Sequence, residues 1–211
     1  MPTVSTLLVF AAASLALLVV PGPAVLYIVT RSVSQGRGAG LVSVLGVHTG
    51  SVVHVAAAAL GLSALLASSA TAFAAVKYAG AAYLLWLGVQ KLRGRHASAE
   101  EEAPPPATRR RLFAQGVVVN VLNPKTAIFF LAFLPQFVHR QRGPVAVQIL
   151  VLGGCFILLG MASDGAYAML AGSLAGRLRR TVRARRRLDR ASGAVFLGLG
   201  AGAALAGNST G

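Results

Sequence analysis

Six long apolar stretches constrain this chain more than any other feature of its sequence. They cover residues 4–29, 41–66, 70–92, 112–138, 145–174 and 188–206. Each is long enough to cross the hydrocarbon core of a bilayer, which takes about 20 mostly apolar residues in a helix. We therefore expect an all-α polytopic membrane protein with six transmembrane helices, folded as a single membrane domain over residues 1–211.

The composition excludes a water-soluble domain. Hydrophobic residues make up 55% of the chain and charged residues 12%, and the mean hydropathy is +0.70, so too few polar side chains exist to cover a soluble exterior. The first stretch resembles the core of a signal peptide, but no residue from Met1 to Val20 is charged and the apolar run continues past Ala13. We expect it to be retained as the first span.

Basic residues are distributed unevenly among the connections between the spans. Most of the 20 Lys and Arg residues lie in the first, third and fifth connections, which include Arg31, Arg37, residues 109–111 and the arginine-rich run 177–190. Basic residues favour the cytoplasmic side of a membrane. The pattern therefore predicts cytoplasmic odd-numbered loops and places both termini on the extracytoplasmic side.

The net charge of +15 also raises the possibility of a nucleic-acid partner. The run 177–190 has no aromatic residue that would stack on bases, so we expect no nucleic-acid partner and assign its arginines to anionic lipid head groups. Cys155 is the single cysteine, and no Walker-type phosphate loop is present. We expect no metal site, no cofactor and no nucleotide-driven step.

A polar linker divides the six spans into two groups of three. Residues 93–111 include three glutamates at 100–102 and three prolines at 104–106, a composition typical of solvated linkers. We expect a first three-helix half over residues 1–92, a cytoplasmic linker over 93–111 and a second half over 112–211. An odd number of spans in each half gives the halves opposite orientations, which predicts a 3+3 inverted repeat.

Proline interrupts the first span of each half, at Pro21-Gly22-Pro23 and at Asn123-Pro124-Lys125. Proline removes a backbone donor and breaks or kinks a helix, so we predict that the first and fourth helices are broken. Paired interruptions of this kind indicate the midplane binding site of a transporter, because broken-helix ends offer oriented N–H and C=O groups to a charged solute. We assign Pro21, Gly22, Pro23, Asn123, Pro124 and Lys125 to this site, and extend it to Tyr27 and Asn120 by their spacing from the breaks.

Few ionisable side chains lie inside the spans, and each costs about 2.5–3.5 kcal/mol to insert, so such groups usually face a cavity or a partner. We expect Asp164 and Lys125 to bracket the solute or to pair; a static strut for Asp164 and an interfacial position for Lys125 stay open. Gly46, Gly50 and His54 share one helix face that another helix can approach closely. Asp164 is our first candidate for a proton carrier and His54 our second, whereas we expect His48, about 120° away around the helix, to be a packing residue.

Several of these motifs occur together in one order along nearly the whole chain. They are Pro21-Gly22-Pro23, Ser34-Gln35-Gly36, Gly40 with Gly46, Gly50 and His54, Tyr83-Leu84-Leu85-Trp86-Leu87-Gly88, and Asn123-Pro124-Lys125. The set resembles the lysine exporter superfamily and, within it, the homoserine/threonine exporter branch. The arginine-rich loop before the sixth span departs from the family pattern, but it does not touch the expected site.

The resemblance implies a secondary transporter that exports amino acids or their derivatives, of the homoserine, threonine, homoserine lactone, leucine or lysine type. It also implies proton antiport across the bacterial inner membrane. A channel or structural membrane protein is the alternative. An intramembrane enzyme is disfavoured, because the sequence contains no Gly-x-Ser-x-Gly and no His-Glu-x-x-His motif. The glycine-lined faces would permit a homodimer.

Overall fold

The computed structural model describes residues 1–68 and 106–173, together with Tyr78, Ala82, Trp86 and Val89. Within these residues every regular element is helical: α1 (Val4–Val19), α2 (Pro23–Gln35), α3 (Arg37–Ser68), α5 (Arg109–Val121), α6 (Pro124–Ile128), a π-helical turn (Phe129–Phe133), two 3₁₀ turns (Leu134–Phe137 and Arg140–Arg142) and α7 (Val145–Ser173). The third and sixth expected spans lie outside the described residues, apart from the four isolated positions.

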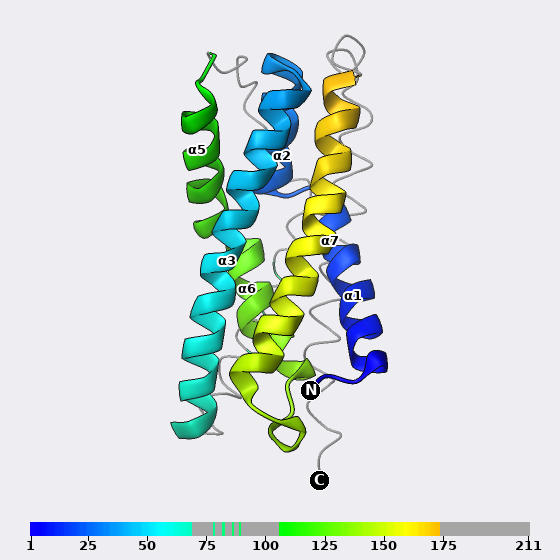
Figure 1. The fold of residues 1–211 in the computed structure, drawn as a ribbon, viewed down its shortest axis with the longest axis vertical. Helices are drawn as coiled ribbons and strands as arrows, with labels where there is room; N and C mark the ends of the chain where they lie inside the picture. The colour runs from blue at the N-terminus through cyan, green and yellow to red at the C-terminus, as the bar shows by residue number, and fades with distance from the viewer. Residues whose placement is uncertain (69–77, 79–81, 83–85, 87–88, 90–105, 174–211) are drawn as a thin grey trace.

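The described helices form an elongated bundle (Figure 1). Two stretches, Arg37–Gly61 of α3 and Val145–Ser173, are long and apolar enough to cross a membrane as straight helices. Two bent pairs, α1 with α2 and α5 with α6 and its continuation to Phe137, reach the same length together. The described residues therefore hold two to four candidate spans, and the apolar runs around residues 145–174 and 41–66 are confirmed as long helices.

Both predicted breaks are present. The axes of α1 and α2 meet at 53° across Pro21-Gly22-Pro23, and those of α5 and α6 meet at 48° across Leu122 and Asn123. Proline cannot continue the hydrogen-bond ladder of the preceding helix, and each new helix begins with proline in its first turn, where no N–H is needed. The first pair ascends in Figure 1 and the second descends, so the broken spans run in opposite directions.

The continuation of α6 does not keep α-helical geometry. Phe129–Phe133 form a π-helical turn, and Leu134–Phe137, which include Pro135, tighten into a 3₁₀ turn. A π-helical turn widens the backbone and is frequent at functional sites. The sequence predicts the break at Asn123-Pro124 but not this change of helix type within residues 129–137.

Small residues let α3 pack against α5 at backbone distance. A β-carbon on Gly46 would lie 2.2 Å from the carbonyl oxygen of Phe113, and one on Gly50 would lie 2.8 Å from that of Val117. From the other side, a β-carbon on Gly116 would lie 2.8 Å from the carbonyl oxygen of Ser43. The close helix approach predicted for the glycine face of α3 is therefore confirmed.

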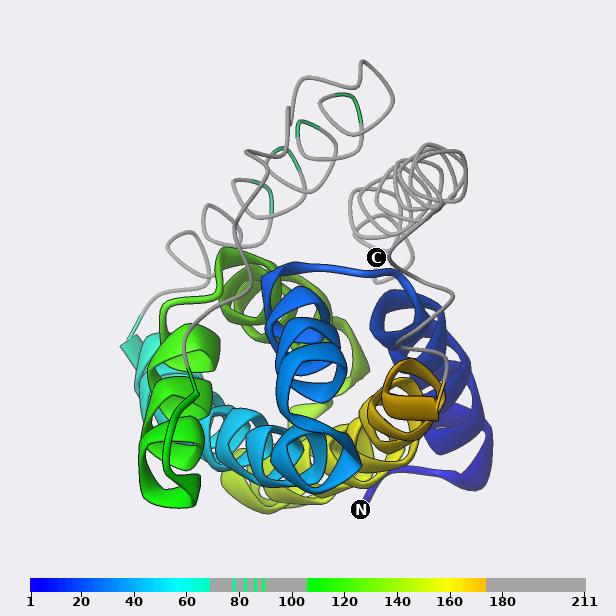
Figure 2. The same cartoon turned by 90° about the horizontal axis from the view of Figure 1, so that it is seen from above.

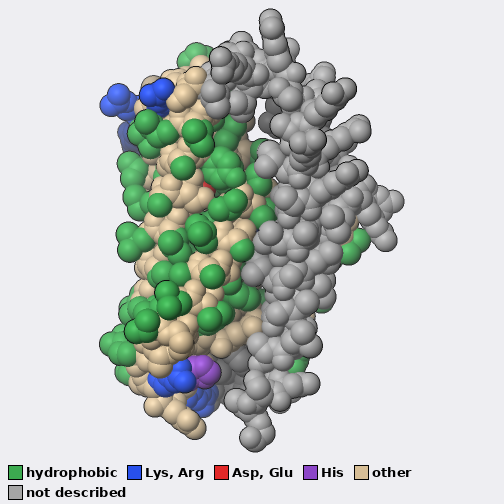
Figure 3. All heavy atoms as spheres, turned by 90° about the vertical axis from the view of Figure 1, so that its right-hand side faces the viewer, with side chains coloured by type: hydrophobic (Ala, Val, Ile, Leu, Met, Phe, Trp, Pro, Cys, Tyr) green, Lys and Arg blue, Asp and Glu red, His purple; other side chains and the backbone are tan. Residues whose placement is uncertain are grey.

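The Lys and Arg side chains on the described surface lie at the two ends of the bundle (Figure 3). Figure 3 shows hydrophobic side chains along the described surface, with Lys and Arg side chains gathered at its ends. Arg37 at the start of α3 packs near Gly172 at the end of α7, and α5, which starts at Arg109, begins at the same end of the bundle (Figure 1). At the opposite end the N-terminal ammonium of Met1 donates to the carbonyl of Arg142. An apolar belt between polar ends suits a protein that crosses a bilayer.

Candidate functional site

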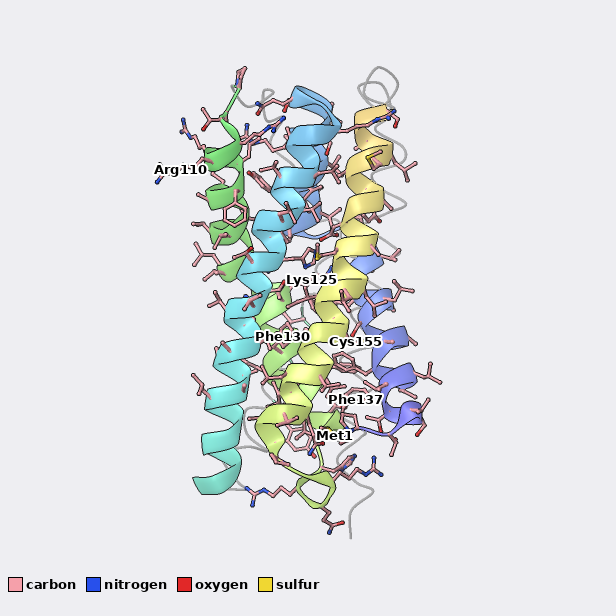
Figure 4. The ribbon with its side chains drawn as sticks, in the orientation of Figure 1. Met1, Arg110, Lys125, Phe130, Phe137 and Cys155 are labelled. Atoms are coloured by element: carbon pink, nitrogen blue, oxygen red, sulfur yellow. The ribbon has the colours of Figure 1, made fainter. Side chains whose placement is uncertain are left out.

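A polar pocket lies where the two helix breaks meet. Figure 2, which looks down the long axis, shows α2 enclosed by the other described helices, and Figure 4 shows Lys125 about midway along the bundle. Fourteen residues line the pocket: Leu17, Leu18, Gly22, Ala24, Val25, Val47, His48, Ser51, Asn120, Asn123, Lys125, Thr126, Phe156 and Asp164. Its volume is about 30 Å³, and about 10–15 Å³ on this measure holds one water molecule. The pocket in this conformation therefore has room for water but not for an amino acid.

The first break supplies backbone acceptors to the pocket. The carbonyls of Leu17, Val19 and Val20 lie at the end of α1, and side chains of other helices donate to them; Leu17 also accepts from the backbone N–H of Val20. The ammonium of Lys125 donates to the carbonyls of Leu17 at 2.7 Å and Val20 at 2.6 Å. The Tyr167 hydroxyl donates to the carbonyl of Val19 at 2.6 Å. Lys125 is buried, so the second break caps the end of the first with a positive charge.

Asp164 and His48 form a buried acidic wall opposite. The Nε2 atom of His48 lies 3.0 Å from Oδ2 of Asp164, and both side chains are buried. The remaining polar atoms of the pair, Nδ1 of His48 and Oδ1 of Asp164, have no hydrogen-bond partner among the described residues. The imidazole fits because residue 160 is glycine: a β-carbon there would lie 2.3 Å from Cε1 of His48. Buried unpartnered polar atoms beside a pocket indicate that a ligand, water or proton completes the arrangement.

Asn120 joins the second break to α3 through a chain of hydrogen bonds. Its amide nitrogen donates to the hydroxyl of Ser51 at 2.9 Å, and its amide oxygen accepts from the hydroxyl of Thr126 at 3.1 Å. Asn123 caps the next helix, since its side-chain oxygen accepts from the backbone N–H of Lys125. Both amides predicted to face the broken region do line the pocket.

Only some of the predicted site residues line the pocket. Of the predicted set, Gly22, Asn120, Asn123, Lys125 and Asp164 line it, whereas Pro21, Pro23, Tyr27, Pro124 and His54 are not among its lining residues. The Tyr27 hydroxyl donates to the carbonyl of Leu112. His54 donates through Nε2 to the carbonyl of Asn120 and stacks on Phe130.

Sequence reasoning ranked His54 above His48, but His48 is the histidine that reaches the pocket. Both histidines lie on α3, and the angle between them around the helix is known from sequence. The sequence does not say which face of α3 turns toward α7, and that packing decides which histidine meets Asp164. A glycine at position 160, one turn from Asp164, is the only local sign that a large ring packs there.

An aromatic cluster closes the pocket toward the end of the bundle that holds Met1. Phe156 lines the pocket and packs on Phe129 and Phe130, and these rings continue to Phe133, Phe137 and Phe10 with centroid separations of 5.0 to 5.9 Å. Phe130 and Phe137 lie progressively closer to Met1 in Figure 4. Packed aromatic rings therefore lie between the pocket and this end of the bundle.

Polar contacts between α2 and the start of α5 close the other side. The guanidinium of Arg31 donates to the side-chain oxygen of Gln115 at 3.0 Å and to that of Gln35 at 3.3 Å, and it lies over the ring of Tyr27. Gln35 in turn exchanges two hydrogen bonds with the backbone of Ala107. Among the described residues, a polar layer therefore lies on one side of the pocket and an aromatic layer on the other.

Comparison with known proteins gives consistent matches. The model of the family described as LysE type translocator matches residues 15–207. The homoserine/homoserine lactone efflux proteins of Salmonella typhimurium and Salmonella typhi are each 34% identical to this chain over 181 residues, which is 86% of this chain and 87% of theirs. An uncharacterized membrane protein of Vibrio cholerae is 32% identical over 85% of this chain and 87% of its own. No solved structure matches.

Proposed function

The chain belongs to the LysE type translocator family, and from this premise we propose that it exports small amino acids or their derivatives, of the homoserine or threonine type, by proton antiport. The family is one of membrane transporters for amino-acid efflux, which makes the enzyme alternative a poor fit. The names of the two Salmonella relatives favour homoserine and homoserine lactone as the first solutes to test. We place the protein in the bacterial inner membrane with both termini extracytoplasmic.

The observation that carries this proposal is a pocket with two kinds of charge at mid-bundle. It contains the cation Lys125, the acid Asp164 and the carbonyls that end α1. The start of α2 adds N–H groups, because its N-cap Gly22 offers no side-chain cap and Ala24 lines the pocket. An ammonium suits the carbonyls and Asp164, and a carboxylate suits the N–H groups and Lys125, so the two poles of an amino acid find complementary partners.

We assign proton coupling to Asp164 together with His48. Antiport requires that proton and solute compete for one site, and a carboxyl can hold either a proton or an ammonium ion. Asp164 is buried, faces the pocket and has one oxygen without a hydrogen-bond partner among the residues that the structure describes. The titratable groups around the pair are Lys125 across the pocket and Tyr167, one turn along α7. His48 can accept or release a proton as the carboxyl changes partner.

Alternating access would open one enclosing layer at a time. The contacts of Arg31 and Tyr27 with α5 lie toward the end that holds Arg37 and Arg109, which we take as cytoplasmic. The aromatic cluster around Phe130 and Phe137 lies toward the other end. The opposite directions of the two broken spans fit the inverted repeat that we include in this proposal.

Counterflow in proteoliposomes tests the proposed activity. Vesicles containing the purified protein and loaded with L-homoserine should accumulate labelled L-homoserine, and L-threonine or homoserine lactone inside should support the exchange. Protein-free vesicles and vesicles loaded with 4-hydroxybutyrate, which lacks the ammonium group, are the controls. No exchange by any amino acid or lactone in a panel that includes leucine and lysine would reject the transporter assignment.

A further inference from the structure

The ammonium of Lys125 occupies a site that suits a free ammonium ion. It donates to two carbonyl oxygens, of Leu17 and Val20, at 2.7 and 2.6 Å, at the C-terminal end of α1. The carbonyls at a helix C-terminus carry partial negative charge and attract cations. The α-ammonium group of an amino acid has the same charge and the same three donors as the lysine head group.

We propose that the carbonyls of Leu17 and Val20 are the ammonium subsite for the transported solute, and that Lys125 fills this subsite when no solute is bound. This inference rests on the proposed function and identifies the ammonium as the chemical group of the solute that the site recognises. Homoserine and homoserine lactone, the solutes in the names of the Salmonella relatives, share an ammonium group, whereas the lactone has no carboxylate. A subsite for the shared group accounts for both.

The packing of Lys125 supports a displaceable occupant. Its stem lies along the first break, where a β-carbon on Gly22 would be 3.0 Å from Cδ of Lys125. The pocket volume of about 30 Å³ is too small for an amino acid while this stem is in place. Movement of Lys125 away from the carbonyls enlarges the pocket and opens a position for another donor at Val20 and at Leu17, which keeps its bond from the N–H of Val20.

Exchange of one ammonium for another leaves no buried acceptor unpaired. The solute takes over the carbonyls of Leu17 and Val20, and the displaced lysine remains in the same pocket as Asp164 and the solute carboxylate, where it is paired again. A desolvated carbonyl without a donor is costly, so the end of α1 stays satisfied in both states. Lys125 thus occupies the ammonium subsite when no solute is bound and keeps the carbonyls of Leu17 and Val20 hydrogen-bonded.

Chemical rescue tests the inference. Replacement of Lys125 by Ala removes three carbons and the ammonium, which together have the shape of propylammonium. Adding propylammonium to the purified Lys125→Ala protein should raise its Tm by about 3 °C or more, whereas wild type should not respond because its own lysine fills the site. Tetramethylammonium, a cation without N–H donors, should have no effect on either protein.

Competition then separates a solute subsite from a structural cap. L-homoserine should also raise the Tm of Lys125→Ala, and its shift should not add to that of propylammonium, because both occupy the same carbonyls. Additive shifts, no shift with L-homoserine alone, or no propylammonium shift would each overturn the inference. If wild type shows no counterflow while L-homoserine and propylammonium still compete in Lys125→Ala, the proposed transport is wrong and the ammonium subsite stands. The two failures are therefore distinguishable.

One further variant and one further measurement keep the test decisive. Lys125→Gln retains one donor amide and should show a smaller propylammonium shift than Lys125→Ala. If Lys125→Ala yields folded protein only when propylammonium is present during extraction, that dependence supports the site as strongly as a Tm shift. If neither variant responds to propylammonium in extraction or in the Tm, the carbonyls are not an ammonium subsite.

Discussion

The two polar walls of the pocket differ in how completely their groups are paired. The wall at the helix breaks is satisfied, since Lys125 and Tyr167 donate to the carbonyls that Pro21 leaves open. The wall formed by α3 and α7 is not, because the pair of His48 and Asp164 keeps two buried polar atoms without partners among the described residues. A satisfied wall stabilises one conformation, and an unsatisfied one responds to a ligand or proton. We therefore expect the first wall to govern stability and solute binding, and the second to govern coupling.

Asp164→Asn should have the largest effect on transport. The amide has nearly the shape of the carboxyl but cannot exchange a proton, so accumulation driven by a pH gradient should fall by at least about tenfold. Proteoliposomes with an imposed gradient measure this, and Ser163→Ala on the same helix is the control. Wild-type accumulation in Asp164→Asn would remove the carboxyl from coupling.

The two histidines give a matched comparison. His48→Gln should reduce gradient-driven transport several-fold, within the about 5–150-fold range typical of coupling between sites, and should flatten its pH dependence. His54→Gln should keep the pH profile of the wild type, because His54 bonds a backbone carbonyl outside the pocket.

The pH profile has a defined direction. If proton and solute compete at Asp164, then raising the pH removes the proton and should strengthen solute binding to wild type, while binding to Asp164→Asn should be independent of pH over the same range. Equal profiles for His48→Gln and His54→Gln would show that the wall of α3 and α7 plays no special part.

Gly160→Ala should disturb the acidic wall without changing its chemistry. The added methyl group would lie 2.3 Å from Cε1 of His48, so the ring must move or the helices must separate, at a cost of about 1–3 kcal/mol. Gly165→Ala on the same helix meets nothing within 4 Å and should not destabilise the protein. Thermal unfolding in detergent compares the two, and equal midpoints would contradict the close packing of His48 on α7.

Tyr167→Phe should have the smallest effect. It removes one hydrogen bond to the carbonyl of Val19, which is worth about 0.5–1.5 kcal/mol, and it leaves the contacts of Lys125 with Leu17 and Val20 in place. We expect a slightly lower unfolding midpoint and nearly normal counterflow. A loss of transport as large as that of Asp164→Asn would mean that Tyr167 belongs to the coupling groups.

Local sequence signals predicted the elements that depend on backbone chemistry. Proline determined the position of both breaks, and the spacing of Gly46 and Gly50 predicted the close approach of another helix. These features follow from which hydrogen bonds and contacts a residue type allows, whatever the rest of the fold.

Features that depend on how helices face each other could not be read from the sequence. The partner of Asp164 is set by the rotation of α3 against α7, and the hydrogen bonds of Lys125 to Leu17 and Val20 are set by the bend at Pro21. The π-helical turn at Phe129–Phe133 has no local signature. Tyr27 was expected in the pocket from its spacing alone, and it bonds Leu112 instead.

Proton release on solute binding tests the central claim most directly. Calorimetric titration of the purified protein with L-homoserine, in buffers with different ionisation enthalpies, measures whether binding expels a proton. We predict buffer-dependent heats that show proton release for wild type, and heats independent of the buffer for Asp164→Asn. Binding without proton release in wild type, or the same release in Asp164→Asn, would contradict a shared site for solute and proton between the two helix breaks.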